Sequence, residues 1–74
     1  MDIRKISVGP DYKSGAMHYL VGQDVLNGSH KIHLIKFDEM KKSFKIWIIK
    51  SNEVVLWKEF TSQIPISIEY NINF

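Results

Sequence analysis

Apolar and polar residues alternate one by one towards the C-terminal end of the chain. From Ile64 to Phe74 every even position is apolar or aromatic, and the odd positions hold Pro65, Ser67, Glu69 and two asparagines. Because successive side chains of a β-strand point to opposite faces, this period of two predicts a strand with one buried face. Pro65 has no backbone N–H to give to a ladder, so it is expected at the start of the strand or at an edge.

Two further strands are predicted in the middle of the chain, over residues 44–49 and 54–60. Both stretches are rich in β-branched and aromatic residues, which strands prefer. The short segment Ser51 to Glu53 separates them and has the length of a tight hairpin turn. One face of this hairpin is expected to gather five apolar side chains, those of Phe44, Ile46, Ile48, Leu56 and Phe60.

The length of the turn decides which residues of this hairpin face each other. A three-residue turn sets Trp47 opposite Trp57. The same register sets Lys45 opposite Glu59, which is a favourable pair of opposite charges. A two-residue turn would instead set Lys45 against Lys58, and like charges directly opposite each other destabilise a sheet. The three-residue turn is therefore the prediction.

Shorter apolar runs separated by turn residues fill the first half of the chain. These runs cover residues 3–8, 16–21, 25–26 and 31–37. Asn27-Gly28 lies between the last two and favours a hairpin, because both residues accept a positive φ. Gly9-Pro10-Asp11 is a turn sequence that is expected to stop the first strand. Gly22 is expected to bend or bulge its strand. Residues 38–42 are expected to form a connecting loop or a single helical turn.

About six strands and no helix are predicted, with turn signals about every 8–16 residues, which is typical of small barrels and sandwiches. The 74 residues are enough for one domain, residues 1–74. We therefore expect a single all-β domain, a small and mainly antiparallel barrel or sandwich. The chain has no cysteine, no apolar run near the ~20 residues of a membrane helix and no signal-peptide pattern at its start. These features predict a cytoplasmic protein with no membrane association.

The positive charge of the chain is modest. The net charge is +2, and nine of the ten basic residues are lysines, with Arg4 as the single arginine. Proteins that read phosphates and bases tend to use arginine for its planar fork, whereas a lysine-rich surface is often a device for solubility. The charge is compatible with a polyanionic partner and does not require one.

No residue pattern indicates catalysis. The sequence holds no Cys nucleophile, no G-x-S-x-G elbow, no glycine-rich phosphate loop and no H-E-x-x-H. His30 and His33 are three residues apart on one predicted strand, so their side chains should point to opposite faces. His18 and His33 could meet across neighbouring strands, but a third metal ligand is not apparent. We predict no enzyme activity, no cofactor and no metal site.

Aromatic residues interleaved with lysines in the central hairpin are the candidate binding site. The residues of this candidate site are Lys41, Lys42, Lys45, Trp47, Trp57 and Lys58. Aromatic platforms in a cationic groove bind single-stranded nucleic acid through base stacking. Aromatic side chains also anchor protein interfaces. The third interpretation is that both tryptophans fill a hydrophobic layer while the lysines face water. A smaller aromatic-basic group near the first turn, Tyr12, Lys13, Met17, His18 and Tyr19, is a secondary candidate.

Two pairs of segments carry a resemblance to known proteins. They are VGPDY (8–12) with MHYLVGQ (17–23), and LWKEF (56–60) with IEYNINF (68–74). They resemble small accessory proteins of T-even-like bacteriophages. This resemblance implies a protein of the infected cell that binds a host or phage factor, and it assigns no functional residue. Residues 21–28 are also similar in shape to a corner of SH3-like barrels, which concerns the fold alone.

The sequence thus predicts a non-enzymatic interaction module that binds and modulates a protein partner. The alternative is a nucleic-acid-binding module of the OB or SH3-like type. A third interpretation is a structural piece of a virion or larger complex, because short chains with open sheet edges can assemble. A homo-oligomer of this small domain is a further possibility.

Overall fold

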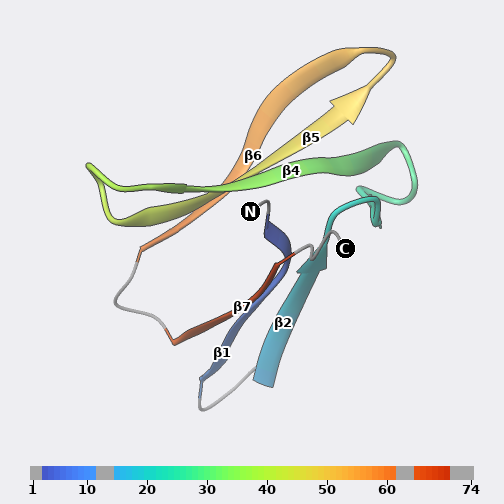
Figure 1. The fold of residues 1–74 in the computed structure, drawn as a ribbon. Helices are drawn as coiled ribbons and strands as arrows, with labels where there is room; N and C mark the ends of the chain where they lie inside the picture. The colour runs from blue at the N-terminus through green and yellow to red at the C-terminus, as the bar shows by residue number, and fades with distance from the viewer. Residues whose placement is uncertain (1–2, 12–14, 62–64, 71–74) are drawn as a thin grey trace.

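The computed structural model describes residues 3–11, 15–61 and 65–70, and these residues form strands and turns with no helix (Figure 1). The prediction of an all-β fold is confirmed. The strands are β1 (Ile3–Asp11), β2 (Gly15–Leu20), β3 (Asp24–Val25), β4 (His30–Asp38), β5 (Ser43–Lys50), β6 (Glu53–Thr61) and β7 (Ile66–Tyr70). The short β3 brings the total of described strands to seven, against the six or so that the sequence predicts.

The strands form two antiparallel sheets that share one core. The first sheet has the order β2-β1-β7 and the second the order β3-β4-β5-β6. Gly22 links them at the point where the chain leaves β2, with its N–H donating to the Ile32 carbonyl at 2.8 Å and its φ at 93°. A positive φ of this size suits glycine. The predicted bend at Gly22 is therefore confirmed, and it helps the sheets curl into a half-barrel (Figure 1).

The core lies between the facing sides of the two sheets. Its buried apolar side chains are those of Ile3, Ile6, Val8, Tyr19, Val25, Ile32, Ile35, Phe44, Ile46 and Ile48. On β1 the buried Ile6 and Val8 alternate with the half-buried Lys5 and Ser7, as one face of a strand turns inward. Tyr19 of β2 spans the core and packs its ring against Phe60 of β6, with 5.5 Å between ring centroids.

The predicted register of the central hairpin is wrong beside its turn and correct at its other end. The turn has two residues, Ser51 and Asn52, and Lys50 pairs with Glu53. Trp47 therefore lies opposite Leu56, and the predicted Trp47–Trp57 pair does not form. Both turn residues have positive φ angles, 50° and 67°. That geometry is characteristic of the two-residue hairpin turns whose twist matches that of the strands.

A β-bulge at Trp57 accounts for both outcomes. Trp57 is the extra residue of β6 between the Ile46–Lys58 and Trp47–Leu56 pairs. The inserted residue shifts the register by one step, so that Lys45 lies opposite Glu59 as predicted. The bulge removes the Lys45–Lys58 conflict that argued against a two-residue turn.

Strand β7 is an edge strand and is less buried than its alternation predicts. It pairs only with β1 among the described strands, and Ile68 lies opposite the fully buried Ile6. Ile66 packs against the core, but Ile68 and Tyr70 are 37% and 44% exposed. The polar Ser67 and Glu69 are exposed, as predicted. The remaining positions of the predicted strand, 64 and 71–74, lie outside the described residues.

The first half of the chain matches its predicted turns, with one correction. Val25 pairs with His30 across the Asn27-Gly28 hairpin, which confirms that prediction. Residues 39–42 form a turn, as the loop interpretation predicts. The first strand does not stop at Val8 but continues as β1 to Asp11. Gly9 adopts a φ of 97° within an irregular stretch of the β1–β2 register, so the turn residues are absorbed into the strand.

The central turn offers a way to stabilise the fold. Ser51→Asn combined with Asn52→Gly is expected to raise the free energy of unfolding by about 0.5–1 kcal/mol, because Asn-Gly fits two positive φ angles best. Urea denaturation measures the change. Ser51→Val is the control, since a β-branched residue at this φ should destabilise the protein. A lower urea midpoint for the Asn-Gly variant would contradict the turn geometry.

Candidate functional site

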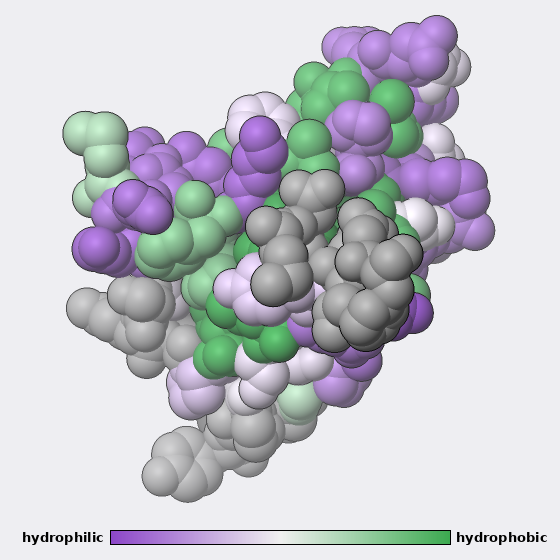
Figure 2. Space-filling model, in the orientation of Figure 1, coloured by the Kyte–Doolittle hydropathy of each residue, from purple (hydrophilic) through white to green (hydrophobic). Residues whose placement is uncertain are grey.

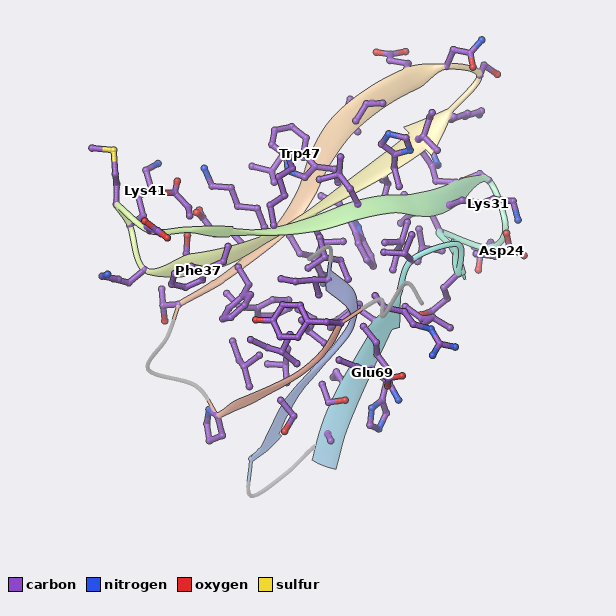
Figure 3. All side chains as sticks on the ribbon, in the orientation of Figure 1. Asp24, Lys31, Phe37, Lys41, Trp47 and Glu69 are labelled. Atoms are coloured by element: carbon purple, nitrogen blue, oxygen red, sulfur yellow. The ribbon has the colours of Figure 1, made fainter. Side chains whose placement is uncertain are left out.

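The outward face of the four-stranded sheet carries apolar side chains in two neighbouring rows. In one row Trp47 of β5 lies between Leu34 of β4 and Leu56 of β6. In the next row Ile49 lies beside Val54. Figure 3 shows the Trp47 side chain on the side of the sheet that faces away from the three-stranded sheet. We call these five residues the outer patch.

The outer patch is accessible from solvent. Val54 and Leu56 are 41% and 45% exposed, and the other three side chains are half-buried among their neighbours. Figure 2 shows apolar side chains bordered by hydrophilic ones over the β5–β6 hairpin. Within residues 3–11, 15–61 and 65–70, no strand or turn covers this face. A group of aliphatic side chains around one indole is typical of interaction surfaces.

Lys45 borders the outer patch, and two carboxylates compensate its charge. Its Nζ lies 3.1 Å from Oδ2 of Asp38 and 3.9 Å from Oε2 of Glu59. Ser43 fixes the second carboxylate by donating from Oγ to Oε2 of Glu59 at 2.7 Å. Lys36 lies directly opposite Lys45 on β4. The two carboxylates therefore also offset the repulsion between these lysines.

Asp38 is held in its charged form by several donors. The hydrogen bond from Lys45, the backbone N–H of Lys41 and the backbone N–H of Met40 all lower the pKa of the Asp38 carboxyl. The two backbone N–H groups donate to Oδ1 at 3.2 and 3.0 Å. Asp38 thus closes the turn between β4 and β5 and positions Lys45 at the same time.

Lys41 and Lys42 lie in that turn, at one end of the sheet. Both side chains are exposed, and Lys42 has a φ of 53°. Figure 3 shows Lys41 at this turn, with Lys31 and Asp24 at the opposite end of the sheet. The two lysines are therefore peripheral to the outer patch rather than central to it.

Trp57 and Lys58 belong to the inner side of the sheet. The Trp57 ring packs edge-on against Tyr19, with 5.8 Å between centroids and planes at 79°. The Nζ atom of Lys58 lies 4.8 Å from the centroid of the Trp57 ring, a cation–π contact. Lys58 also lies opposite the buried Ile46. The bulge thus sends Trp57 towards the core while Trp47 faces outward.

The six predicted site residues consequently do not form one surface. Trp47 and Lys45 lie on the outer face, Lys41 and Lys42 at its end, and Trp57 and Lys58 on the inner side. The apolar members that the sequence analysis missed are Leu34, Ile49, Val54 and Leu56. The alternation along each strand assigns these four residues to the outer face only when the bulge at Trp57 is known. Without the bulge, the predicted register places Leu56 on the inner face.

The histidines occupy separate positions. His18 and Ser7, which are paired across β1 and β2, share a hydrogen bond of 2.8 Å, and His30 shares one of 2.7 Å with Ser29. His33 lies at a register irregularity of β4. Strands β2 and β4 belong to different sheets, so the suggested meeting of His18 and His33 across neighbouring strands is wrong. In the part of the chain that the structure describes, no three His, Cys, Asp or Glu side chains form a metal-binding group. Of the secondary candidate group, Tyr12 and Lys13 lie outside the described residues.

The fold and the outer patch define a small all-β protein with an apolar sheet face that no strand of the described residues covers. Comparison with protein-family models, curated proteins and solved structures finds no match. Among the described residues there is no helix of the length and apolarity needed to cross a membrane.

Proposed function

We propose that this protein is a non-enzymatic interaction module that binds another protein through the outer patch. The observation that carries the proposal is the exposed apolar row centred on Trp47. Covering such a row removes apolar area from water, and this transfer contributes a gross free energy of about 25 cal/mol per Å². A tryptophan at the centre of a ring of smaller apolar side chains is the residue type most often found to dominate binding energy at protein interfaces.

The charges around the patch favour a protein over a nucleic acid. A nucleic-acid platform needs uncompensated cations beside its stacking residues. Here Lys45, the lysine beside Trp47, is compensated by Asp38 and Glu59, and Lys31 by Asp24 at 2.8 Å, so Lys36 is the cation next to the patch that no ion pair of the described residues engages. The alternative, a nucleic-acid-binding module, also lacks its second aromatic platform on this face, since Trp57 packs against Tyr19.

The chemistry of the patch describes its partner. The partner presents an apolar surface with a recess for the Trp47 indole. It also presents a carboxylate that faces Lys36, because no ion pair of the described residues engages that lysine. The resemblance to accessory proteins of T-even-like bacteriophages directs the proposal towards a host or phage protein as this partner, in the host cytoplasm. In this role the module modulates its partner by occupying part of its surface.

Affinity capture with matched variants tests the proposal. Tagged protein is incubated with host lysate, with and without nuclease, and the captured protein is then titrated in purified form. Trp47→Ala is expected to weaken the affinity by at least about 30-fold, the effect of a hot spot worth about 2 kcal/mol. Met40→Ala should leave the affinity unchanged, because Met40 is 96% exposed in the β4–β5 turn, outside the patch.

Two results would contradict the proposal. One is equal affinity of the Trp47 and Met40 variants for the captured protein. The other is capture that disappears with nuclease, together with an affinity for single-stranded DNA or RNA that falls steeply with salt, which is the behaviour of phosphate contacts.

A further inference from the structure

Strand β6 forms one edge of the four-stranded sheet. It is nine residues long and pairs with β5 on one side. On its other side, no strand of the described segments pairs with it. An edge strand presents a row of backbone donors and acceptors that another strand can use. Natural proteins block such edges with prolines, lysines or bulges. In β6 Glu53 lies at one end, and the Trp57 bulge and Lys58 at the other, so residues 54–56 between them carry none of these devices.

The unprotected part of β6 is apolar on both faces. Val54 and Leu56 are 41% and 45% exposed on the outer face, and Val55 is 40% exposed on the inner face. A strand added here would therefore meet aliphatic side chains above and below the sheet. This arrangement is unusual for an edge that only contacts water.

The backbone groups of this segment fix which residues can pair. Lys50 and Glu53 close a two-residue turn, where the pair flanking the turn exchanges hydrogen bonds. Along an antiparallel ladder, hydrogen-bonded and non-hydrogen-bonded pairs alternate. The N–H and C=O groups of Val55 therefore point to β5, and those of Val54 and Leu56 point to the free edge.

We propose that β6 pairs antiparallel with β6 of a second copy of this chain, about a two-fold axis through Val55. In this register Val54 of each copy exchanges backbone hydrogen bonds with Leu56 of the other. The two Val55 side chains meet as a non-hydrogen-bonded pair. The two four-stranded sheets join into one sheet, and the two outer patches lie on the same face of it.

The charges of β6 complement each other in this arrangement. Trp57 and Lys58 together occupy one step of the ladder because of the bulge. Glu53 of one copy therefore lies opposite the Trp57–Lys58 step of the other, which places a carboxylate beside an ammonium group on the inner face. A two-fold axis through Val54 would set Leu56 against Asn52 and lose this ion pair. Self-complementarity of this kind is what a two-fold interface requires.

Single-cysteine cross-linking tests the register, because the natural chain has no cysteine. In Val55→Cys the engineered thiols of two copies belong to directly opposed residues, with Cα atoms about 4.5–5.5 Å apart, which suits a disulfide. In the matched control Val54→Cys they are offset by two residues, with Cα atoms about 8 Å apart, beyond disulfide range. We expect Val55→Cys to form a covalent dimer under mild oxidation at least about 10-fold faster than Val54→Cys.

Light scattering of the unsubstituted protein gives the second readout. The mass is expected to rise from 8.7 kDa towards twice that value as the concentration increases to about 1 mM. A monomer at every concentration overturns the proposal. A dimer in which Val54→Cys cross-links as fast as Val55→Cys, or in which neither cross-links, also overturns it. The purified protein is used without any partner, so the result is independent of the function proposed for the outer patch.

Discussion

Ile46→Ala is expected to lower the free energy of unfolding by about 2–5 kcal/mol, the range for truncating a fully buried isoleucine. Ile46 lies at the centre of β5 with 0% exposure and points into the core between the sheets. Truncation removes apolar contacts and leaves a cavity that the surrounding strands cannot fill. Since native proteins have stabilities of about 5–15 kcal/mol, such a loss would remove a large fraction of the total stability.

Ile49→Ala is the matched control for this prediction. Ile49 lies on the same strand with its side chain on the half-buried outer face, so less buried volume is lost. Urea denaturation followed by circular dichroism measures both variants. An equal loss of stability in the two would mean that the inner and outer faces of β5 are assigned incorrectly.

Tyr19→Ala is expected to cost about 3–5 kcal/mol, the range for large aromatic side chains in a core. Tyr19 is 5% exposed, and its ring contacts Trp57 edge-on and Phe60 at a tilt. These contacts join β2 to β6 across the half-barrel, so truncation weakens the packing of one sheet on the other. Tyr19→Phe retains the ring and should recover most of the loss in thermal denaturation. A Tyr19→Phe variant as unstable as Tyr19→Ala would show that the hydroxyl, rather than the ring, joins the sheets.

Tyr19 also makes the stability depend on alkaline pH. Burial raises the pKa of the Tyr19 hydroxyl above its ordinary value of 10.0. The neutral form is therefore favoured by folding. The contribution of the neutral Tyr19 hydroxyl to the free energy of unfolding is fully present below pH 10 and is lost as the pH rises through the raised pKa. Tyr19→Phe should remove this part of the alkaline loss of stability, and an unchanged pH profile would contradict it.

The strands of this protein could be predicted from the alternation towards the C-terminal end and, elsewhere, from runs of β-branched, aromatic and other apolar residues. The stretches 44–49 and 54–60 correspond to β5 and β6, each with one residue added at each end. The Asn27-Gly28 hairpin and the bend at Gly22 were predictable for a local reason, since both depend on positive φ angles.

The position of the bulge could not be predicted. The residues of the outer patch depend on that position, so they could not be predicted either. The structure has a two-residue turn at Ser51-Asn52, whereas the Lys45–Glu59 pair needs the register of a three-residue turn. A bulge satisfies both, but nothing local to Trp57 marks it. Its position reflects the packing of the indole against Tyr19, a residue 38 positions away along the chain.

The alternation pattern also could not predict how exposed the side chains of β7 are. Alternation assigns a side chain to a face of a strand, and Ile68 does lie opposite the buried Ile6. It does not tell whether that face is covered by another layer. Because β7 is an edge strand of the first sheet, its inward side chains are only partly enclosed.

The bulge at Trp57 gives the protein two indole chromophores in different surroundings. Trp57 lies edge-on to Tyr19 and under the Lys58 ammonium group, so its fluorescence follows the packing between the sheets. Trp47 lies among aliphatic side chains on the outer face, so its emission responds to whatever covers that face. The emission of the natural chain is thus the sum of two contributions, and the contribution of Trp47 is the one that a partner on the outer face would change directly.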